Sequence, residues 1–85
     1  MALKQKLMQI LESRFPAPDK VNLRFDDGII GIVTSKQFRN MDLMQRQDAI
    51  HELLEANLTP KERRKVLIIV AVTPEEEKAR AAMGE

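Results

Sequence analysis

A group of basic residues between positions 61 and 65 has the chemistry that is easiest to name in this 85-residue sequence. It directly follows Thr59-Pro60. Thr favours the N-cap of a helix and Pro suits the first helical position. The first amides of such a helix could hold a phosphate, and the cations could supply the counter-charge. The sequence therefore predicts a candidate nucleic-acid site, whose residues are Thr59, Lys61, Arg63, Arg64 and Lys65.

The same residues also have a purely structural interpretation. Cations near the C-terminal end of a short helix complement its dipole, and charges beside an apolar strand oppose aggregation. The chain has no Trp or Tyr and only three Phe, so few rings are available to stack on bases. Its net charge is +1, so no whole-molecule field draws it to polyanions. Any nucleic-acid site would therefore be a local patch.

Other candidate chemistry has less support. His51 is the only histidine, and one His without companion ligands makes no metal site. Asp26 and Asp27 could form a carboxylate pair, but adjacent Asp residues before Gly28 are typical of a tight hairpin. The chain has no Cys to act as nucleophile or metal ligand, and no Ser or Thr belongs to a recognisable triad. We expect neither enzyme activity nor a cofactor.

The elements that position these residues follow from hydrophobic periodicity. Val21, Leu23 and Phe25 alternate with polar residues, which predicts a strand that buries these three side chains on one face. A hairpin is expected at Asp27-Gly28, because both central residues of a type I′ turn have positive φ. Predicted strands span residues 20–25, 29–35 and 66–72. Predicted helices span residues 2–14 and 41–56, a short segment from 60, and a segment from 74 towards Gly84.

This order, α-β-β-α-α-β-α, predicts an α+β fold with two layers: a three-stranded mixed sheet and the helices packed on it. The connection of about thirty residues before the last strand is long enough for a parallel crossover. A chain of this length is expected to form one domain over residues 1–85. No apolar run approaches the roughly 20 residues of a membrane span, and the first residues lack a signal-peptide core. We therefore expect a cytoplasmic protein without membrane association.

The order of elements and several residues together resemble the BolA family, whose fold is like that of class II KH domains. The resemblance covers about residues 1–76. Its most specific part is SKQFRNMDLMQRQ, which repeats the family's spacing of Ser, Phe, Leu and Arg, and VTPEE matches the family's start of the last helix. The matched positions are Ser35, Phe38, Leu43, Arg46, Thr73 and Pro74.

The resemblance implies a regulatory domain of the stress-response type. Better-known members of the family share a two-iron cluster with a monothiol glutaredoxin, and a His at the start of the third strand helps to hold it. Lys65 falls on that position here, and an ammonium group has no lone pair for iron. The loop that supplies a further ligand in the family is cut to residues 26–28. Partnership with a glutaredoxin is therefore the least expected function.

Two other functions remain open. The first is a non-enzymatic BolA-like regulatory or adaptor domain that binds DNA or RNA through the helix–helix junction and the start of the third strand. The second is a protein-interaction module that uses a sheet edge or the Met-bearing helix over 41–56 and binds no nucleic acid.

Overall fold

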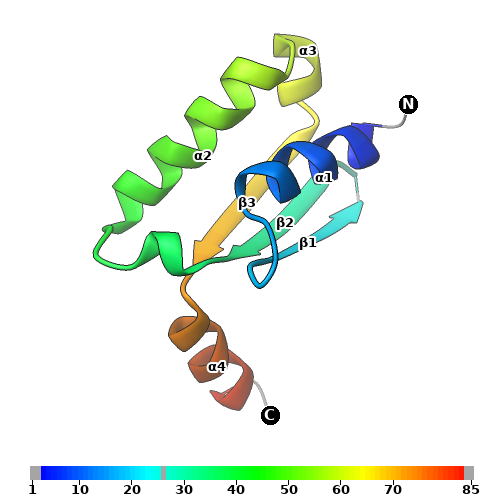
Figure 1. Ribbon diagram of the computed structural model, residues 1–85. Helices are drawn as coiled ribbons and strands as arrows, with labels where there is room; N and C mark the ends of the chain where they lie inside the picture. Colours follow the sequence, from blue (N-terminus) through cyan, green and yellow to red (C-terminus); the bar gives the residue numbers. More distant parts are fainter. Residues whose placement is uncertain (1–2, 26, 84–85) are drawn as a thin grey trace.

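The computed structural model describes residues 3–25 and 27–83, and its elements follow the predicted α+β order (Figure 1). The helices are α1 (Leu3–Arg14), α2 (Leu43–Asn57), α3 (Pro60–Arg63) and α4 (Pro74–Met83), with a 3-10 helix, η1 (Lys36–Phe38). The strands are β1 (Lys20–Phe25), β2 (Ile29–Thr34) and β3 (Val66–Val72). The predicted helix start at Ala2, the hairpin residue Asp26 and the predicted helix end at Gly84 lie outside the described residues.

The three strands form one mixed sheet in the order β1-β2-β3. β1 pairs with β2 antiparallel, and β3 pairs with β2 in parallel, as the long crossover predicts. A β-bulge separates the pairs Ile29–Val66 and Ile30–Ile68, which leaves Leu67 without a partner on β2. Within the described residues, no helix is both long enough and apolar enough to cross a membrane.

The sheet has one covered face and one open face. Helices α1 and α2 lie over the covered face, where Leu7 and Leu11 of α1 and Ile50 and Leu54 of α2 are buried in one core with Ile69. Phe15 and Phe38 join this core, and their ring centroids are 5.3 Å apart. The open face carries branched apolar side chains that are half-buried or exposed: Ile30, Ile32, Ile68, Val70 and Val72. Helix α4 continues beyond the end of β3 and does not return over the sheet (Figure 1).

The β1–β2 hairpin has the positive φ values that its sequence predicts, and its strands end at Phe25 and begin again at Ile29, as predicted. Asp27 has φ 54° and Gly28 has φ 138°. The last pair of the ladder is Phe25–Ile29, so three residues connect the strands in place of the two of a type I′ loop. A Cβ atom at Gly28 would lie 2.6 Å from Leu67 Cγ, so both the backbone angle and the packing of Leu67 require glycine here. The bulged Leu67 thereby covers the hairpin.

Candidate nucleic-acid interface

Thr59 begins α3 with a capping box. Its Oγ1 accepts a hydrogen bond from Glu62 N (3.1 Å), and Glu62 Oε1 accepts one from Thr59 N (2.9 Å). Lys6 of α1 donates to both oxygens of the same carboxylate, at 2.9 and 3.0 Å. The hydrogen bond from the Thr59 backbone, and then that from Lys6, hold the pKa of Glu62 below its ordinary value. A carboxylate of the protein thus occupies the start of α3, where the sequence suggested a phosphate, and Thr59 has a structural role.

The side chains of the four predicted cations have different neighbours and different exposure. Arg63 is half-buried, and its Nη1 lies 3.4 Å from Glu55 Oε2 on α2. His51 Nε2 lies 3.0 Å from the same oxygen, so these three side chains form a small network. Lys61, Arg64 and Lys65 are exposed, and no carboxylate of residues 3–25 or 27–83 forms a salt bridge with them. We call Lys61, Arg64 and Lys65 the basic end.

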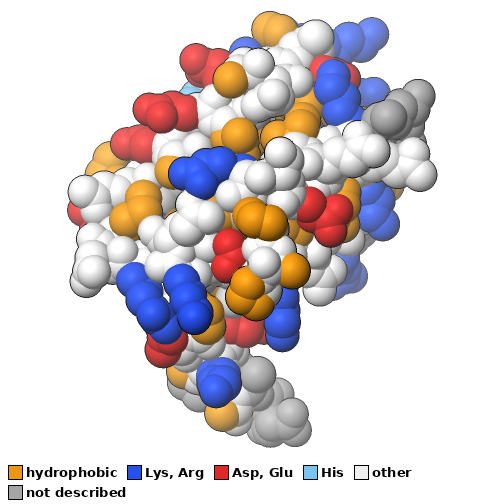
Figure 2. Space-filling view, viewed as in Figure 1, with side chains coloured by type: hydrophobic (Ala, Val, Ile, Leu, Met, Phe, Trp, Pro, Cys, Tyr) orange, Lys and Arg blue, Asp and Glu red, His pale blue; other side chains and the backbone are white. Residues whose placement is uncertain are grey.

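The basic end lies beside an exposed aromatic ring. Arg64 and Lys65 line a shallow cavity of about 550 Å³ together with Phe25 and residues of the hairpin and α1: Leu3, Asp27 and Gly28. Figure 1 places the end of α3 and the β1–β2 hairpin at the same end of the sheet, and Figure 2 shows Lys and Arg side chains gathered over that region. Phe25 is 64% exposed. The sequence prediction that Phe25 is buried with Val21 and Leu23 is therefore wrong.

Phe25 is exposed because the covering layer ends before the strand does. The buried residues of α1 are Leu7 and Leu11, and Leu3, the first described residue of that helix, is the one that reaches the cavity of Phe25. Alternation along a strand identifies the face on which a side chain lies, but it contains no information about where the opposing helix begins. The only feature of the sequence that could have indicated the exposure of Phe25 is its position beside the turn.

A narrow groove runs between α2 and the outer edge of β3. Its volume is about 190 Å³, and its lining comes from the two elements alone: Gln47, Ile50, His51 and Leu54 on α2, and Val66, Leu67, Ile68 and Ile69 on β3. Leu67 and Ile68 are 55% and 49% exposed. Helix α3 lies between α2 and β3 in the chain and connects the two walls of this groove (Figure 1). The basic end therefore lies at the end of the groove where the chain passes from α2 to β3. The groove is mostly apolar, with Gln47 and His51 as its polar groups.

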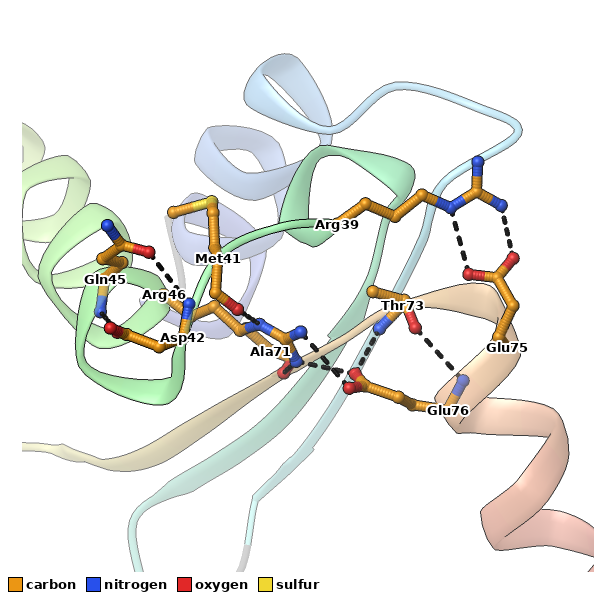
Figure 3. Close-up of polar contacts among 9 residues, drawn as sticks. All are labelled: Arg39, Met41, Asp42, Gln45, Arg46, Ala71, Thr73, Glu75 and Glu76. Carbon is orange, nitrogen blue, oxygen red and sulfur yellow. Dashed lines mark hydrogen bonds and ion pairs between the residues drawn. The ribbon is translucent and has the colours of Figure 1, made fainter.

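The positions that resemble the BolA motif mostly hold the opposite end of the molecule together (Figure 3). Arg46 of α2 donates from Nε to Met41 O (3.0 Å), from Nη1 to Ala71 O (3.2 Å) and from both Nη atoms to the Glu76 carboxylate (2.6 and 3.2 Å). Thr73 caps α4, since its Oγ1 accepts from Glu76 N (3.1 Å) and its N donates to Glu76 Oε1 (2.8 Å). The bond with Arg46, followed by that from Thr73 N, lowers the pKa of Glu76 to about 2. We call Arg46, Thr73 and Glu76 the α4 corner.

Three further motif positions have defined surroundings. Ser35 is fully buried, donates to Asp19 Oδ2 (2.8 Å) and accepts from Gln37 N (3.0 Å), which caps η1. Phe38 is buried in the core, and Pro74 begins α4. Leu43, in contrast, is 70% exposed. The motif residues thus serve structure at the start of η1 and at the α4 corner, and only Leu43 faces solvent.

Within the described residues, no group of three or more His, Asp or Glu side chains is arranged to hold a metal ion. Lys65, on the position that the family resemblance assigns to a ligating His, is exposed, and its carbonyl accepts a hydrogen bond from Ile29 N (2.7 Å). Comparison with known proteins finds no family model, no curated protein and no solved structure that matches this chain.

Proposed function

We propose that this chain is a non-enzymatic, BolA-like regulatory or adaptor domain that binds nucleic acid at the basic end, between the α2–α3 junction and the start of β3. One observation carries the proposal: Arg64 and Lys65 line the same cavity as the exposed ring of Phe25. Cations attract the phosphate backbone, and an exposed aromatic ring offers a face for a base. Lys61 extends the positive surface along α3.

The expected binding is modest and sensitive to salt. Three exposed cations can neutralise about three phosphates, which for a single strand gives a slope of log K against log salt of about −2. Attraction over long range contributes little, because the chain has a net charge of only +1. Arg63 adds less than its neighbours, since it is already close to Glu55.

The resemblance to the BolA family supports the regulatory part of the proposal. The fold expected from it, an α-β-β-α-α-β-α chain with one parallel strand pair, agrees with the order and pairing of the elements. The family's cluster chemistry is a poorer candidate for this chain. The ammonium group of Lys65 offers no lone pair to iron, and no group of three or more His, Asp or Glu side chains among the described residues is arranged to hold a metal ion.

Two matched triple variants test the proposal. Lys61→Ala/Arg64→Ala/Lys65→Ala removes the basic end, and Lys20→Ala/Lys36→Ala/Lys78→Ala removes three exposed cations that line a different cavity, beside Pro74 of α4. Each takes the net charge from +1 to −2. Fluorescence anisotropy with labelled oligonucleotides of mixed sequence should show a loss of affinity of tenfold or more for the first variant and of at most about threefold for the second.

Two outcomes would contradict the proposal. Equal weakening by both triple variants would mean that net charge alone attracts the oligonucleotide. A wild-type protein that binds neither DNA nor RNA at low salt would remove nucleic-acid binding altogether.

The open face favours a second candidate function, protein interaction. Five branched apolar side chains lie side by side there without a covering helix, and large uncovered apolar surfaces often mark interaction sites. Leu43 and Met44, 70% and 75% exposed at the start of α2, are a smaller apolar surface on the Met-bearing helix. Affinity purification from the native cell with the wild type, with Ile68→Lys and with the basic-end triple variant separates the two functions. A protein lost only with Ile68→Lys would favour this candidate.

A further inference from the structure

The cavity at the hairpin contains an acidic group that phosphate binding does not explain. Asp27 is exposed and lines the cavity with Phe25, Arg64 and Lys65. A carboxylate repels phosphate, and a neutral Asn would tolerate the same positive φ in the turn, so a surface that binds only the nucleic-acid backbone would gain from Asn at this position. An ionised carboxylate accepts hydrogen bonds and donates none. The group is therefore suited to a ligand that presents an N–H donor close to its phosphate.

The hairpin holds Asp27 in a defined position. Asp27 adopts a left-handed backbone conformation, with φ 54°, which Asp and Asn tolerate better than most residues. The next residue, Gly28, is buried and has Leu67 packed directly against it. Backbone pairing closes the hairpin on one side, and Ile29 N donates to Lys65 O (2.7 Å) on the other. The hairpin and the start of β3, which carry the acid and the cations, are thus joined by a main-chain hydrogen bond.

The walls of the cavity match the parts of a nucleotide. Phe25 and Leu3 are apolar, Asp27 accepts hydrogen bonds, and Arg64 and Lys65 are cationic. A base can stack on an exposed Phe ring only if that face of the base is free, which excludes a base inside a duplex. A carboxylate pairs with an exocyclic amino group such as N4 of cytosine, whereas uracil has a carbonyl oxygen at the same position.

We propose that this cavity binds one unpaired base that carries an exocyclic amino group, with cytosine preferred over uracil. The inference rests on the proposed nucleic-acid binding and specifies its ligand as single-stranded. The base stacks on Phe25, its amino group donates to Asp27, and the adjoining phosphates lie near Arg64 and Lys65. Single-stranded oligocytidylate should therefore bind more tightly than oligouridylate of the same length, and more tightly than a duplex.

A tryptophan in place of Phe25 gives a direct readout of stacking. The chain has no Trp or Tyr, so Phe25→Trp introduces the only strongly fluorescent side chain. Stacking with a base should quench this fluorescence, and the larger ring should preserve affinity. Met44→Trp is the matched control, because Met44 is also exposed, at 75%, and belongs to the start of α2 and not to the cavity. Its fluorescence should stay unchanged when oligocytidylate is added.

Two further variants test the contacts one at a time. Phe25→Ala should weaken the binding of oligocytidylate about tenfold, which lies within the effects known for removal of one ring that stacks on a base. Because Phe25 is largely exposed, the thermal stability of this variant should stay close to that of the wild type. Asp27→Asn retains the shape and the tolerance for positive φ but adds an amide donor, so it should abolish the preference for cytosine over uracil.

The outcomes separate this inference from the function on which it rests. Suppose that binding depends on salt and is weakened by the basic-end triple variant, but that oligocytidylate leaves the fluorescence of the Phe25→Trp variant unchanged. This result would overturn the base site and leave nucleic-acid binding intact. Equal affinity for duplex and single strand, or a cytosine preference that survives Asp27→Asn, would also overturn the base site. If the wild type binds no oligonucleotide at low salt, both proposals fail together.

Discussion

The chain begins two helices with the same four-residue pattern, Thr-Pro-x-Glu, in two very different settings. At α3 and at α4 the Thr hydroxyl accepts from the Glu amide, and the Glu carboxylate accepts from the Thr amide. In each motif the Glu carboxylate also forms a salt bridge with a cation from another helix: Glu62 with Lys6 of α1, and Glu76 with Arg46 of α2. The local geometry is the same, so the difference between the two ends must come from what surrounds each cap.

At the α4 corner the capping carboxylate is paired with a largely buried cation. Arg46 is only 12% exposed and joins α2, the end of β3 and α4 through one guanidinium group. Arg39 adds a second pair with Glu75, which raises the pKa of Arg39 through the hydrogen bond and the nearby charge. At the basic end the cap is also satisfied, yet Lys61, Arg64 and Lys65 remain exposed. The charges of the α4 corner itself are paired, whereas those of the basic end are exposed, and this contrast indicates a division between structure and binding.

The largest effect that tests this division is expected from Arg46→Ala. The change removes hydrogen bonds to two main-chain carbonyls and both contacts with Glu76, so the free energy of unfolding should fall by about 2–3 kcal/mol. Arg64→Ala is the matched control, because it deletes the same side chain from the basic end and should change stability by less than about 0.5 kcal/mol. Urea denaturation measures both. Similar losses in the two variants would remove the distinction between the ends.

A smaller effect should separate the two caps themselves. Thr73 is 5% exposed and Thr59 is an exposed residue. Thr73→Ala should cost about 1–2 kcal/mol of unfolding free energy, and Thr59→Ala about 0.5–1 kcal/mol, within the range known for N-caps. The same urea titrations detect the difference. A larger loss from Thr59→Ala would show that α3, and not the α4 corner, contributes more to stability.

The smallest effect is expected in acid. The folded-state pKa of Glu76 is about 2, below its unfolded value, first because of Arg46 and then because of Thr73 N. Its contribution to stability is therefore present above about pH 5 and is lost as the pH falls towards 2. Glu76→Gln should lose less stability than the wild type between pH 5 and pH 2. Glu62→Gln should show a weaker change in the same direction, since the pKa of Glu62 is also lowered. Thermal melts across this range measure both slopes.

Local signals were enough to predict much of the fold. The helix cap at Thr59, the start of the last helix at Thr73-Pro74, the Asp27-Gly28 hairpin and the apolar run of β3 each depend on a few neighbouring residues, and the order of elements follows from them. The length of the crossover through α2 and α3 was enough to predict that β3 pairs in parallel with β2. The three-residue loop of the hairpin agrees with the predicted strand ends at Phe25 and Ile29, although it is one residue longer than the two-residue type I′ loop expected at Asp27-Gly28.

The candidate site was less predictable, because it depends on contacts between distant segments. The position of Arg63 beside Glu55 requires α3 to fold back on α2, and the cavity of Phe25 requires the hairpin, α1 and the start of β3 to meet. Neither arrangement follows from spacing along the chain. The four cations at positions 61–65 form one cluster in the sequence, yet their neighbours in the fold divide them into one paired and three exposed side chains. The BolA resemblance and the function remain predictions.

The contacts of Arg46 and Gln47 with β3 have a further consequence for the behaviour of the protein in concentrated solution. β3 is a seven-residue apolar strand at the edge of its sheet, and such an edge is a template on which another chain can add a strand. Arg46 Nη1 and Gln47 Nε2 donate to the outward carbonyls of Ala71 and Ile69, at 3.2 and 3.5 Å, and so occupy the acceptors that an incoming strand would need. The bulge at Leu67 interrupts the remainder of the edge. Two polar side chains of α2 thus oppose the addition of a strand from another chain at the β3 edge of the sheet.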